Sequence, residues 1–257
     1  MVHPTAPFVG RIISINMERI CYMYTFTGRI RYSELDKNGK LSLPGLINYF
    51  QDCSTFQSEE LGVGVEFFRR RKQVWVLSYW QIEITRLPKL GEQIKIGTFA
   101  TAFNGLYGHR NFILYDESGE MLSCADSIWA FIDLDKGRPV RPSEECVSPY
   151  ETADPLPMKQ EGRKISRPAG GIAYPSFSVA RHHLDTNEHV NNGQYVQMAL
   201  NLLEDDPAVK RVRVEYKKSA VLGDEILPYY AKEAGRTVVE LCDKGKNPYA
   251  IVEMVFD

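Results

Sequence analysis

The chain has 257 residues, enough for one or two globular domains with a sizeable hydrophobic core. Its apolar content of 44% and charged content of 25% are ordinary for a folded protein, and its net charge of −2 gives no overall attraction to nucleic acid or to membranes. The five cysteines are scattered and form no C-x-x-C pair, which argues against a disulfide framework and against a zinc site.

The start of the chain does not have the pattern of a secretory signal. Residues 1–16 lack the charged start and apolar stretch of a secretory signal, and no apolar run in the sequence approaches the length of a membrane span. We therefore expect a cytoplasmic protein in which residues 1–16 form an extension outside the fold.

The first half predicts one long helix followed by strands. Pro44 suits the first turn of a helix that continues to about Leu61. Apolar residues at helical spacing predict its buried face, formed by Leu46, Ile47, Phe50, Cys53 and Phe56. Strand-like runs cover residues 74–87, 92–103, 108–116 and 123–133, with a hairpin turn over residues 116–119.

The second half predicts the same kinds of element. Residues 143–175 are rich in proline, glycine and charge, as linkers are. Beyond them we expect a helix over residues 193–203 and strands over residues 211–218, 224–233, 237–243 and 249–256. One long helix per half among antiparallel strands predicts an α+β fold. We place the two domains at residues 17–142 and 176–257.

Two parts of the chain repeat each other. Leu35, Asp36, Asn38 and Leu41 match Leu184, Asp185, Asn187 and Val190 at one constant offset. Lys40 occupies the place that His189 has in the second copy. A second pair of segments, L-G-E-Q-I over residues 90–94 and L-G-D-E-I over residues 222–226, also matches. We infer two copies of one unit, of which only the second keeps the histidine.

The second copy contains the residue types that a hydrolase needs when water is the nucleophile. In an extended segment Asp185, Asn187 and His189 would share one face. The carboxylate would orient the imidazole, the imidazole would take a proton from water, and the amide would hold the carbonyl. The free N–H groups at the start of the following helix would favour an oxyanion. The alternative interpretation is a polar loop that caps this helix.

The motif D-x-N-x-H-V-N-N-x-x-Y over residues 185–195 resembles that of acyl-acyl-carrier-protein thioesterases, known from plant plastids and bacteria. V-E-Y-K-K over residues 214–218 resembles the family's L-E-Y-R-R, and residues 31–36 and 43–52 resemble its bacterial branch. The resemblance runs from about Tyr24 to the C-terminus. It implies two tandem hotdog domains, each a long helix wrapped by an antiparallel sheet.

The resemblance also implies a reaction, the hydrolysis of fatty acyl thioesters on acyl carrier protein (ACP) during fatty acid biosynthesis. His189 would be the general base, Asp185 would orient it, and Asn187 would hold the thioester carbonyl. The first domain would line the acyl tunnel. No cofactor or metal is implied, because the phosphopantetheine arm belongs to the carrier, and a homodimer is one assembly that we consider.

One position departs from the plant pattern. Plant members continue R-R-E-C-G, whereas this chain continues with Ser219 and Ala220, so that the family's further carboxylate and its cysteine are both missing. Ser219 could position water in place of the carboxylate. The alternative is a solvent-facing serine on a strand.

Two basic clusters could attract the acidic carrier protein. They are Arg69, Arg70, Arg71 and Lys72, and Lys210, Arg211 and Arg213, with Lys217 and Lys218 close by. The alternative is that both clusters are ordinary solvated surface.

Three other functions compete with hydrolysis of acyl-ACP. An acyl-CoA thioesterase would use the same residues. Hotdog hydratases and dehydratases resemble D-x-N-P-L-H, whose longer spacing and proline are missing here. A non-catalytic acyl-binding hotdog protein would need an attached DNA-binding element, and the retained His189 argues against it.

Overall fold

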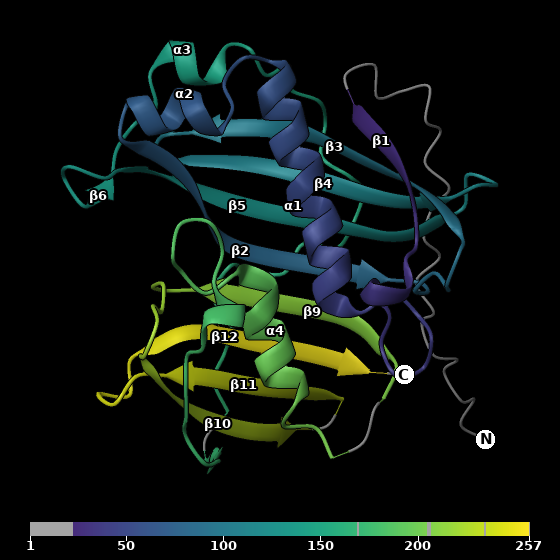
Figure 1. Cartoon of the computed structure of the whole chain (residues 1–257), viewed down its shortest axis with the longest axis vertical. Helices are drawn as coiled ribbons and strands as arrows, with labels where there is room; N and C mark the ends of the chain where they lie inside the picture. Colours follow the sequence, from purple (N-terminus) through teal and green to yellow (C-terminus); the bar gives the residue numbers. More distant parts are fainter. Residues whose placement is uncertain (1–22, 169, 205–206, 234, 257) are drawn as a thin grey trace, which may run out of the picture.

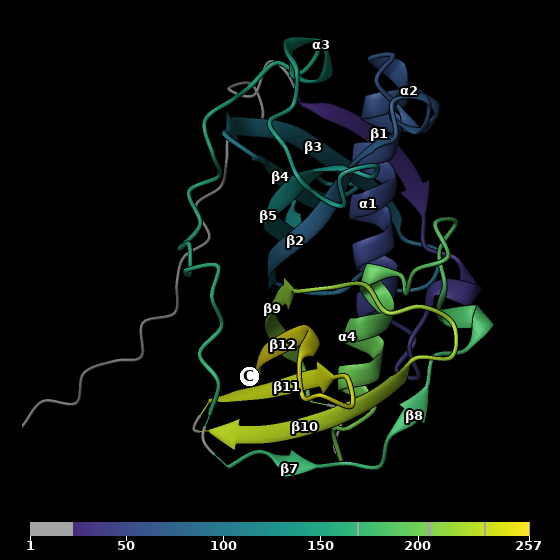
Figure 2. The same ribbon diagram turned by 90° about the vertical axis from the view of Figure 1, so that its left-hand side faces the viewer.

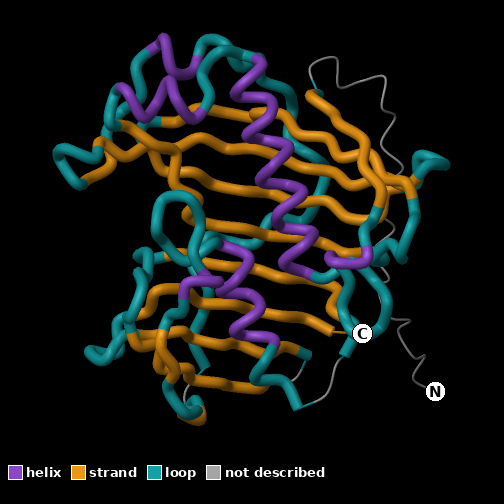
Figure 3. Tube along the Cα trace, viewed as in Figure 1, coloured by secondary structure: helices purple, strands orange, loops and turns teal. Residues whose placement is uncertain are grey.

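The structure is a computed structural model that describes residues 23–168, 170–204, 207–233 and 235–256. Within these ranges one antiparallel sheet of 12 strands runs through both halves of the chain, and two helices cover one of its faces (Figures 1 and 3). The α+β prediction is therefore confirmed. The expected extension of residues 1–16 lies outside the described residues.

The first half contains the longer helix, α1 (Leu43–Glu60). Its strands are β1 (Tyr24–Arg29), β2 (Gln73–Ile84), β3 (Gln93–Asn104), β4 (Tyr107–Asp116), β5 (Met121–Asp133) and the short β6 (Arg138–Pro139). Three short helices accompany them: η2 (Tyr32–Glu34), α2 (Val65–Arg70) and α3 (Glu144–Val147). The predicted long helix and four strands are confirmed to within a few residues, while β1 and the short helices are additions.

The second half repeats this plan with a shorter helix, α4 (Asn192–Leu200), preceded by the 3-10 helix η3 (Arg181–His183). Its strands are β7 (Ile172–Ala173), β8 (Phe177–Ser178), β9 (Val209–Tyr216), β10 (Glu225–Glu233), β11 (Arg236–Cys242) and β12 (Pro248–Phe256). The predicted helix ends earlier than expected, because the chain turns at Asn201 and Leu202. Within the described ranges, each helix is too short or too polar to pass through a lipid bilayer.

α1 begins and packs largely as its sequence predicts. The Ser42 hydroxyl accepts the N–H of Gly45 at 3.2 Å and caps the first turn. Of the predicted buried face, Leu46, Ile47, Phe50 and Cys53 are buried in the core beneath the helix. Phe56 is 44% exposed, so its assignment was wrong. Its ring instead meets the edge of Phe26 on β1, at 5.3 Å between centroids, where the sheet ends.

The two halves meet along β2 and β9, whose antiparallel pairing makes the sheet continuous. The helices meet above this junction. The Asn192 side chain at the start of α4 donates to the Gln51 side chain of α1 at 2.7 Å. Gly193 lies so close to α1 that a Cβ there would be 3.4 Å from the Cα of Pro44. The start of α4 is therefore fixed against the start of α1.

The segment predicted as a linker connects the halves, but it is not an exposed tether. Its first part packs beside α2 and the end of α1, where the Tyr150 hydroxyl lies 2.7 Å from that of Ser58. The part that follows runs along the sheet face opposite to α1 and α4 (Figure 2). Four apolar side chains along it are buried, namely Cys146, Tyr150, Leu156 and Ile165. The N–H of Leu156 donates to the side-chain oxygen of Asn111 on β4 at 2.8 Å. The linker is thus part of the hydrophobic core.

A buried ion pair connects the linker to the central strands. Nη1 of Arg213 on β9 lies 2.8 Å from Oε1 of Glu253 on β12, and both side chains are more than 90% buried. Nε of Arg213 donates to the Tyr79 hydroxyl at 3.1 Å, and Nη2 donates to the carbonyl of Gly162 in the linker. Arg213 therefore joins two strands and the linker.

We predict that Arg213→Met lowers the free energy of unfolding by roughly 3 kcal/mol, because the buried Glu253 carboxylate keeps only its second ion pair, with Arg236 at 2.6 Å, and the Gly162 carbonyl loses its donor. Urea denaturation at neutral pH measures the change. Arg211→Met is the matched control on the same strand, and it should cost less than about 1 kcal/mol because its ion pairs are partly exposed. Equal losses of unfolding free energy in the two variants would contradict a larger stabilising contribution from the buried Arg213.

Candidate functional site

The segment that carries Asp185, Asn187 and His189 is a tight turn. Oδ1 of Asp185 accepts the backbone N–H groups of Asn187 at 2.8 Å and His189 at 3.3 Å. The N–H of Asp185 donates to the carbonyl of His189 at 2.8 Å, which closes the turn. Glu188 adopts a positive φ of 60° within it. The prediction of an extended segment with three side chains on one face was therefore wrong.

This geometry changes the part that Asp185 plays. A short acidic side chain can bond to nearby backbone groups, and here that local bonding wins over an extended conformation. Among the described residues, no hydrogen bond joins the Asp185 carboxylate to the imidazole of His189. The carboxylate instead holds the backbone on which Asn187 and His189 stand.

The first copy has the same turn. Oδ1 of Asp36 accepts the N–H groups of Asn38 at 2.9 Å and Lys40 at 3.0 Å. The N–H of Asp36 donates to the carbonyl of Lys40 at 2.7 Å, and Gly39 has the positive φ, 72°. The repeat inferred from sequence is thus present in the backbone. The aspartate keeps its structural part in a copy that lacks the histidine.

A second segment holds each turn in the same way. In the second copy the N–H of Val190 donates to the carbonyl of Ala220 at 2.9 Å, and His189 forms an isolated bridge with Val221. In the first copy the N–H of Leu41 donates to the carbonyl of Pro88 at 2.8 Å, and Lys40 forms the bridge with Lys89. These contacts place the two L-G-x-x-I segments in equivalent positions.

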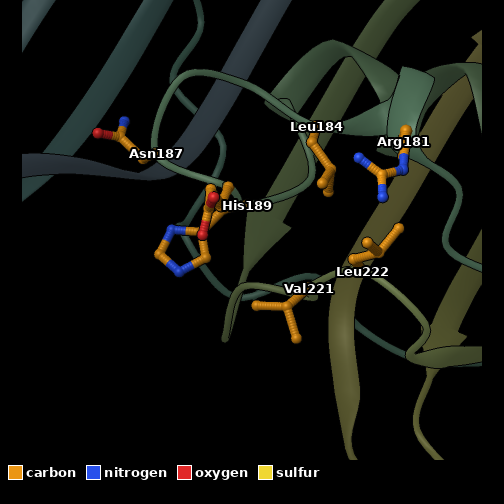
Figure 4. A pocket seen from close by; sticks show the side chains of 7 residues that line it. Arg181, Leu184, Asn187, His189, Val221 and Leu222 are labelled. Atoms are coloured by element: carbon orange, nitrogen blue, oxygen red, sulfur yellow. The ribbon is translucent and has the colours of Figure 1, made fainter.

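The turn of the second copy borders a hollow of about 440 Å³ (Figure 4). This volume lies within the range of small-molecule sites. Its lining consists of Arg181, Leu184, Asn187, Glu188, His189, Val221 and Leu222. Two of the three predicted catalytic residues, Asn187 and His189, therefore reach the same space, and both are exposed. Asp185 is not part of the lining, and its carboxylate instead accepts the backbone N–H groups of Asn187 and His189.

Ser219 does not lie on a strand, so the alternative of a serine on a strand is wrong, although the side chain does face solvent. β9 ends at Tyr216, and Ser219 is exposed in the segment that follows. It is not among the residues that line the hollow. Its neighbour Ala220 has the clearer structural part, because the carbonyl of Ala220 accepts the N–H of Val190 in the turn.

Tyr195 is a residue whose part in the site the sequence did not reveal. It is the last residue of the D-x-N-x-H-V-N-N-x-x-Y motif, and its side chain is 2% exposed. Its hydroxyl accepts the N–H of Ala220 at 2.8 Å, and burial raises its pKa well above the usual range. A tyrosine hydroxyl usually finds a hydrogen-bond partner when it is buried, which was the available signal. Tyr195 thus fixes the segment that holds the His189 turn.

The start of α4 does not present the N–H groups that we expected for an oxyanion. Oδ1 of Asn191 accepts the N–H of Gly193 at 2.8 Å, and the Asn191 carbonyl accepts that of Gln194 at 2.9 Å. Neither Gly193 nor Gln194 lines the hollow. That expectation was wrong, because the asparagine cap satisfies these groups.

The first basic cluster lies at the end of α2. Arg69 and Arg70 both pair with Glu66, and their side chains are 76% and 75% exposed. Arg71 pairs with Glu145 at 2.7 Å, and Lys72 pairs with Asp135 at 2.9 Å. These acidic partners offset much of the positive charge that the sequence suggested.

The second basic cluster is divided between the surface and the core. Lys210 is exposed, whereas Nη1 of Arg211 lies 3.4 Å from Oε1 of Glu161 in the linker. The side chain of Arg213 is 8% exposed and paired with Glu253. Its assignment to a carrier-docking surface was therefore wrong, because alternation along β9 turns this side chain under the linker.

Comparison with known families covers most of the described chain. The family model for the acyl-ACP thioesterase N-terminal domain matches residues 21–150, and the model for the acyl-ACP thioesterase C-terminal domain matches residues 172–247.

Two of the curated relatives come from plants. A chloroplastic acyl-ACP hydrolase of Cuphea viscosissima is 28% identical over 184 residues, which cover 66% of this chain and 44% of that protein. A chloroplastic oleoyl-acyl carrier protein thioesterase of Arabidopsis thaliana is 22% identical over 237 residues, which cover 84% of this chain and 65% of that protein. The chain thus spans between two fifths and two thirds of the length of these two relatives.

Solved structures share the whole architecture. An acyl-ACP thioesterase from Bacteroides thetaiotaomicron aligns with a TM-score of 0.84 at 22% identity, over 92% of this chain and 98% of that one. The 12:0-ACP thioesterase from Umbellularia californica aligns with a TM-score of 0.79 at 17% identity, over 92% of this chain and 97% of that one. The predicted fold of two tandem hotdog domains is confirmed.

We predict that Tyr195→Phe lowers the free energy of unfolding by about 1 to 3 kcal/mol, because the buried N–H of Ala220 loses its acceptor. Hydrogen exchange at Ala220 and Val190 should accelerate with it, as measured by NMR. Tyr230→Phe, on β10, is the control and should leave both amides protected. Unchanged exchange at Ala220 in Tyr195→Phe would show that the hydroxyl is dispensable.

Proposed function

Because the chain belongs to the acyl-ACP thioesterase family, we propose that it hydrolyses the thioester of a fatty acyl group carried on ACP. The observation that carries the proposal is the shared position of His189 and Asn187 at one hollow, in the one copy of the repeat that has a histidine. A base and an amide donor beside one space are the minimum for water-based attack on a thioester.

The proposed chemistry needs no group beyond those side chains and water. His189 takes a proton from water, whose oxygen attacks the thioester carbon. The Asn187 amide donates a hydrogen bond to the carbonyl oxygen as negative charge develops on it. When the carbon–sulfur bond breaks, the imidazolium returns its proton to the departing sulfur. The products are the free fatty acid and the thiol of the carrier arm.

Asp185 contributes by positioning. It fixes the backbone N–H of His189, and its partner in the first copy, Asp36, does the same for Lys40. We therefore propose that Asp185 sets the direction of the His189 side chain through the turn. The first copy would not catalyse, and its helix and sheet would enclose the acyl chain.

The carrier would meet the exposed cations of α2. Arg69 and Arg70 together exceed the charge of their shared partner Glu66 by one unit. Steering of an acidic carrier by these residues would act mainly on the rate of encounter and would weaken with added salt.

We predict that His189→Ala lowers turnover of acyl-ACP by about 10² or more, because the imidazole that takes the proton from water is lost. Release of free fatty acid measures turnover. Thermal unfolding should be unchanged, since His189 is exposed. Lys40→Ala changes the equivalent position of the first copy and should retain wild-type turnover. Near-wild-type turnover in His189→Ala would remove this residue from the mechanism.

We predict that the variants Asp185→Asn and Asp185→Ala differ in turnover. Asp185→Asn keeps an oxygen that can accept both N–H groups, so its turnover should stay close to that of the wild-type protein. Asp185→Ala removes the acceptor, and a displaced His189 should lower turnover by about 10²-fold. Steady-state turnover with one acyl-ACP tests this pair. If Asp185→Asn were as inactive as Asp185→Ala, the negative charge itself would act on the imidazolium.

A further inference from the structure

The hollow beside His189 has a second polar end. In Figure 4 Asn187 and His189 lie at one side and Arg181 at the other, with Leu184 and Val221 between them and Leu222 below Arg181. Among the described residues, no ion pair or hydrogen bond engages the Arg181 guanidinium. The arginines of the basic clusters, by contrast, all pair with carboxylates. Arg181 is thus an exposed cation that borders the candidate active site and has no partner within the described part of the chain.

The wall between the two ends is apolar and open to solvent. Val221 is 42% exposed and Leu222 is 48% exposed. Large apolar side chains gathered around a hollow are typical of a binding site. The hollow therefore offers, in order, a catalytic base, an apolar middle and a cation.

The first copy provides an internal comparison. Each lining residue has an equivalent in the duplicated turn and its neighbouring segment: Tyr32, Leu35, Asn38, Gly39, Lys40, Lys89 and Leu90. The leucines and the asparagine are the same in both copies. The histidine and Arg181 both occur only in the second copy, and Val221 replaces a lysine there. Arg181 thus differs between the copies together with the catalytic residue.

We propose that Arg181 binds the phosphate of the phosphopantetheine arm while the thioester lies at His189. The inference rests on the proposed function and adds the direction in which the arm enters. A guanidinium presents paired donors that match phosphate oxygens. The branched apolar part of the arm, next to its phosphate, lies against Leu184, Val221 and Leu222.

The position of Glu188 supports this direction of entry for the phosphopantetheine arm. Its carboxylate also lines the hollow, and it directly precedes His189 in the turn. A phosphate placed at that end would meet like charge, whereas at Arg181 it meets opposite charge. The arm is therefore oriented by attraction at one end and repulsion at the other.

The test uses two substrates that differ only in the phosphate: one acyl group on phosphopantetheine and the same acyl group on pantetheine. Arg181→Gln should raise KM for the acyl-phosphopantetheine by about tenfold, the loss expected for a charged hydrogen bond, with kcat unchanged. KM for the acyl-pantetheine should not change. Arg181→Lys should recover part of the loss, because it keeps the charge.

Arg31→Gln is the matched control. Arg31 is an exposed arginine beside the equivalent turn of the first copy, and its loss should affect neither substrate. Equal effects of Arg181→Gln on both substrates, or no effect on either, would overturn the assignment of the phosphate to Arg181.

Direct binding separates this inference from the proposed function. Calorimetry with phosphopantetheine and with pantetheine needs no turnover. Binding that depends on the phosphate in the wild-type protein and weakens about tenfold in Arg181→Gln would support the inference even if no acyl thioester were hydrolysed. Equal affinity for the two compounds in the wild-type protein would refute it, while hydrolysis could still proceed.

Discussion

In both halves of this protein one aspartate oxygen accepts two backbone N–H groups, and the rest of the site depends on that arrangement. The bonds from Asp185 close a turn that carries Asn187 and His189 to the same hollow. Behind the turn, Tyr195 holds Ala220, and Ala220 holds Val190. The position of His189 is thus set by hydrogen bonds to backbone N–H groups, which connect the turn to α4 and to the segment after β9.

Much of the fold could be read from the sequence, because periodicity and turn residues reflect local physics. The α1 helix has Pro44 in its first turn and most of its apolar face where helical spacing places it, and all eight predicted strands occur. Phe56 was misassigned because it continues the helical pattern beyond the width of the sheet. The tight packing of the linker could not be inferred either, since proline-rich composition does not reveal which face a segment covers.

The sequence indicated which residues to examine for a site, but it did not give their geometry. The repeat and the D-x-N-x-H motif located His189 and Asn187 correctly at one space. Residues 185–189 could either extend or form a turn closed by hydrogen bonds to Asp185. The alternation of residue types along the sequence does not decide between these two conformations. Arg213 was misjudged because its partner Glu253 is distant in sequence, and pairing between β9 and β12 is what buries both.

The continuous sheet has a consequence for how the two copies can diverge. β2 and β9 pair across the junction as equivalent strands of two subunits would in a symmetric dimer. In such a dimer any substitution appears at both sites, because both subunits share one sequence. Fusion into one chain removes that coupling. The first copy can therefore carry Lys40 at the position equivalent to His189 while the second copy keeps its histidine. The surface around the Asp36 turn is thus free to acquire a different partner without any change at the Asp185 turn.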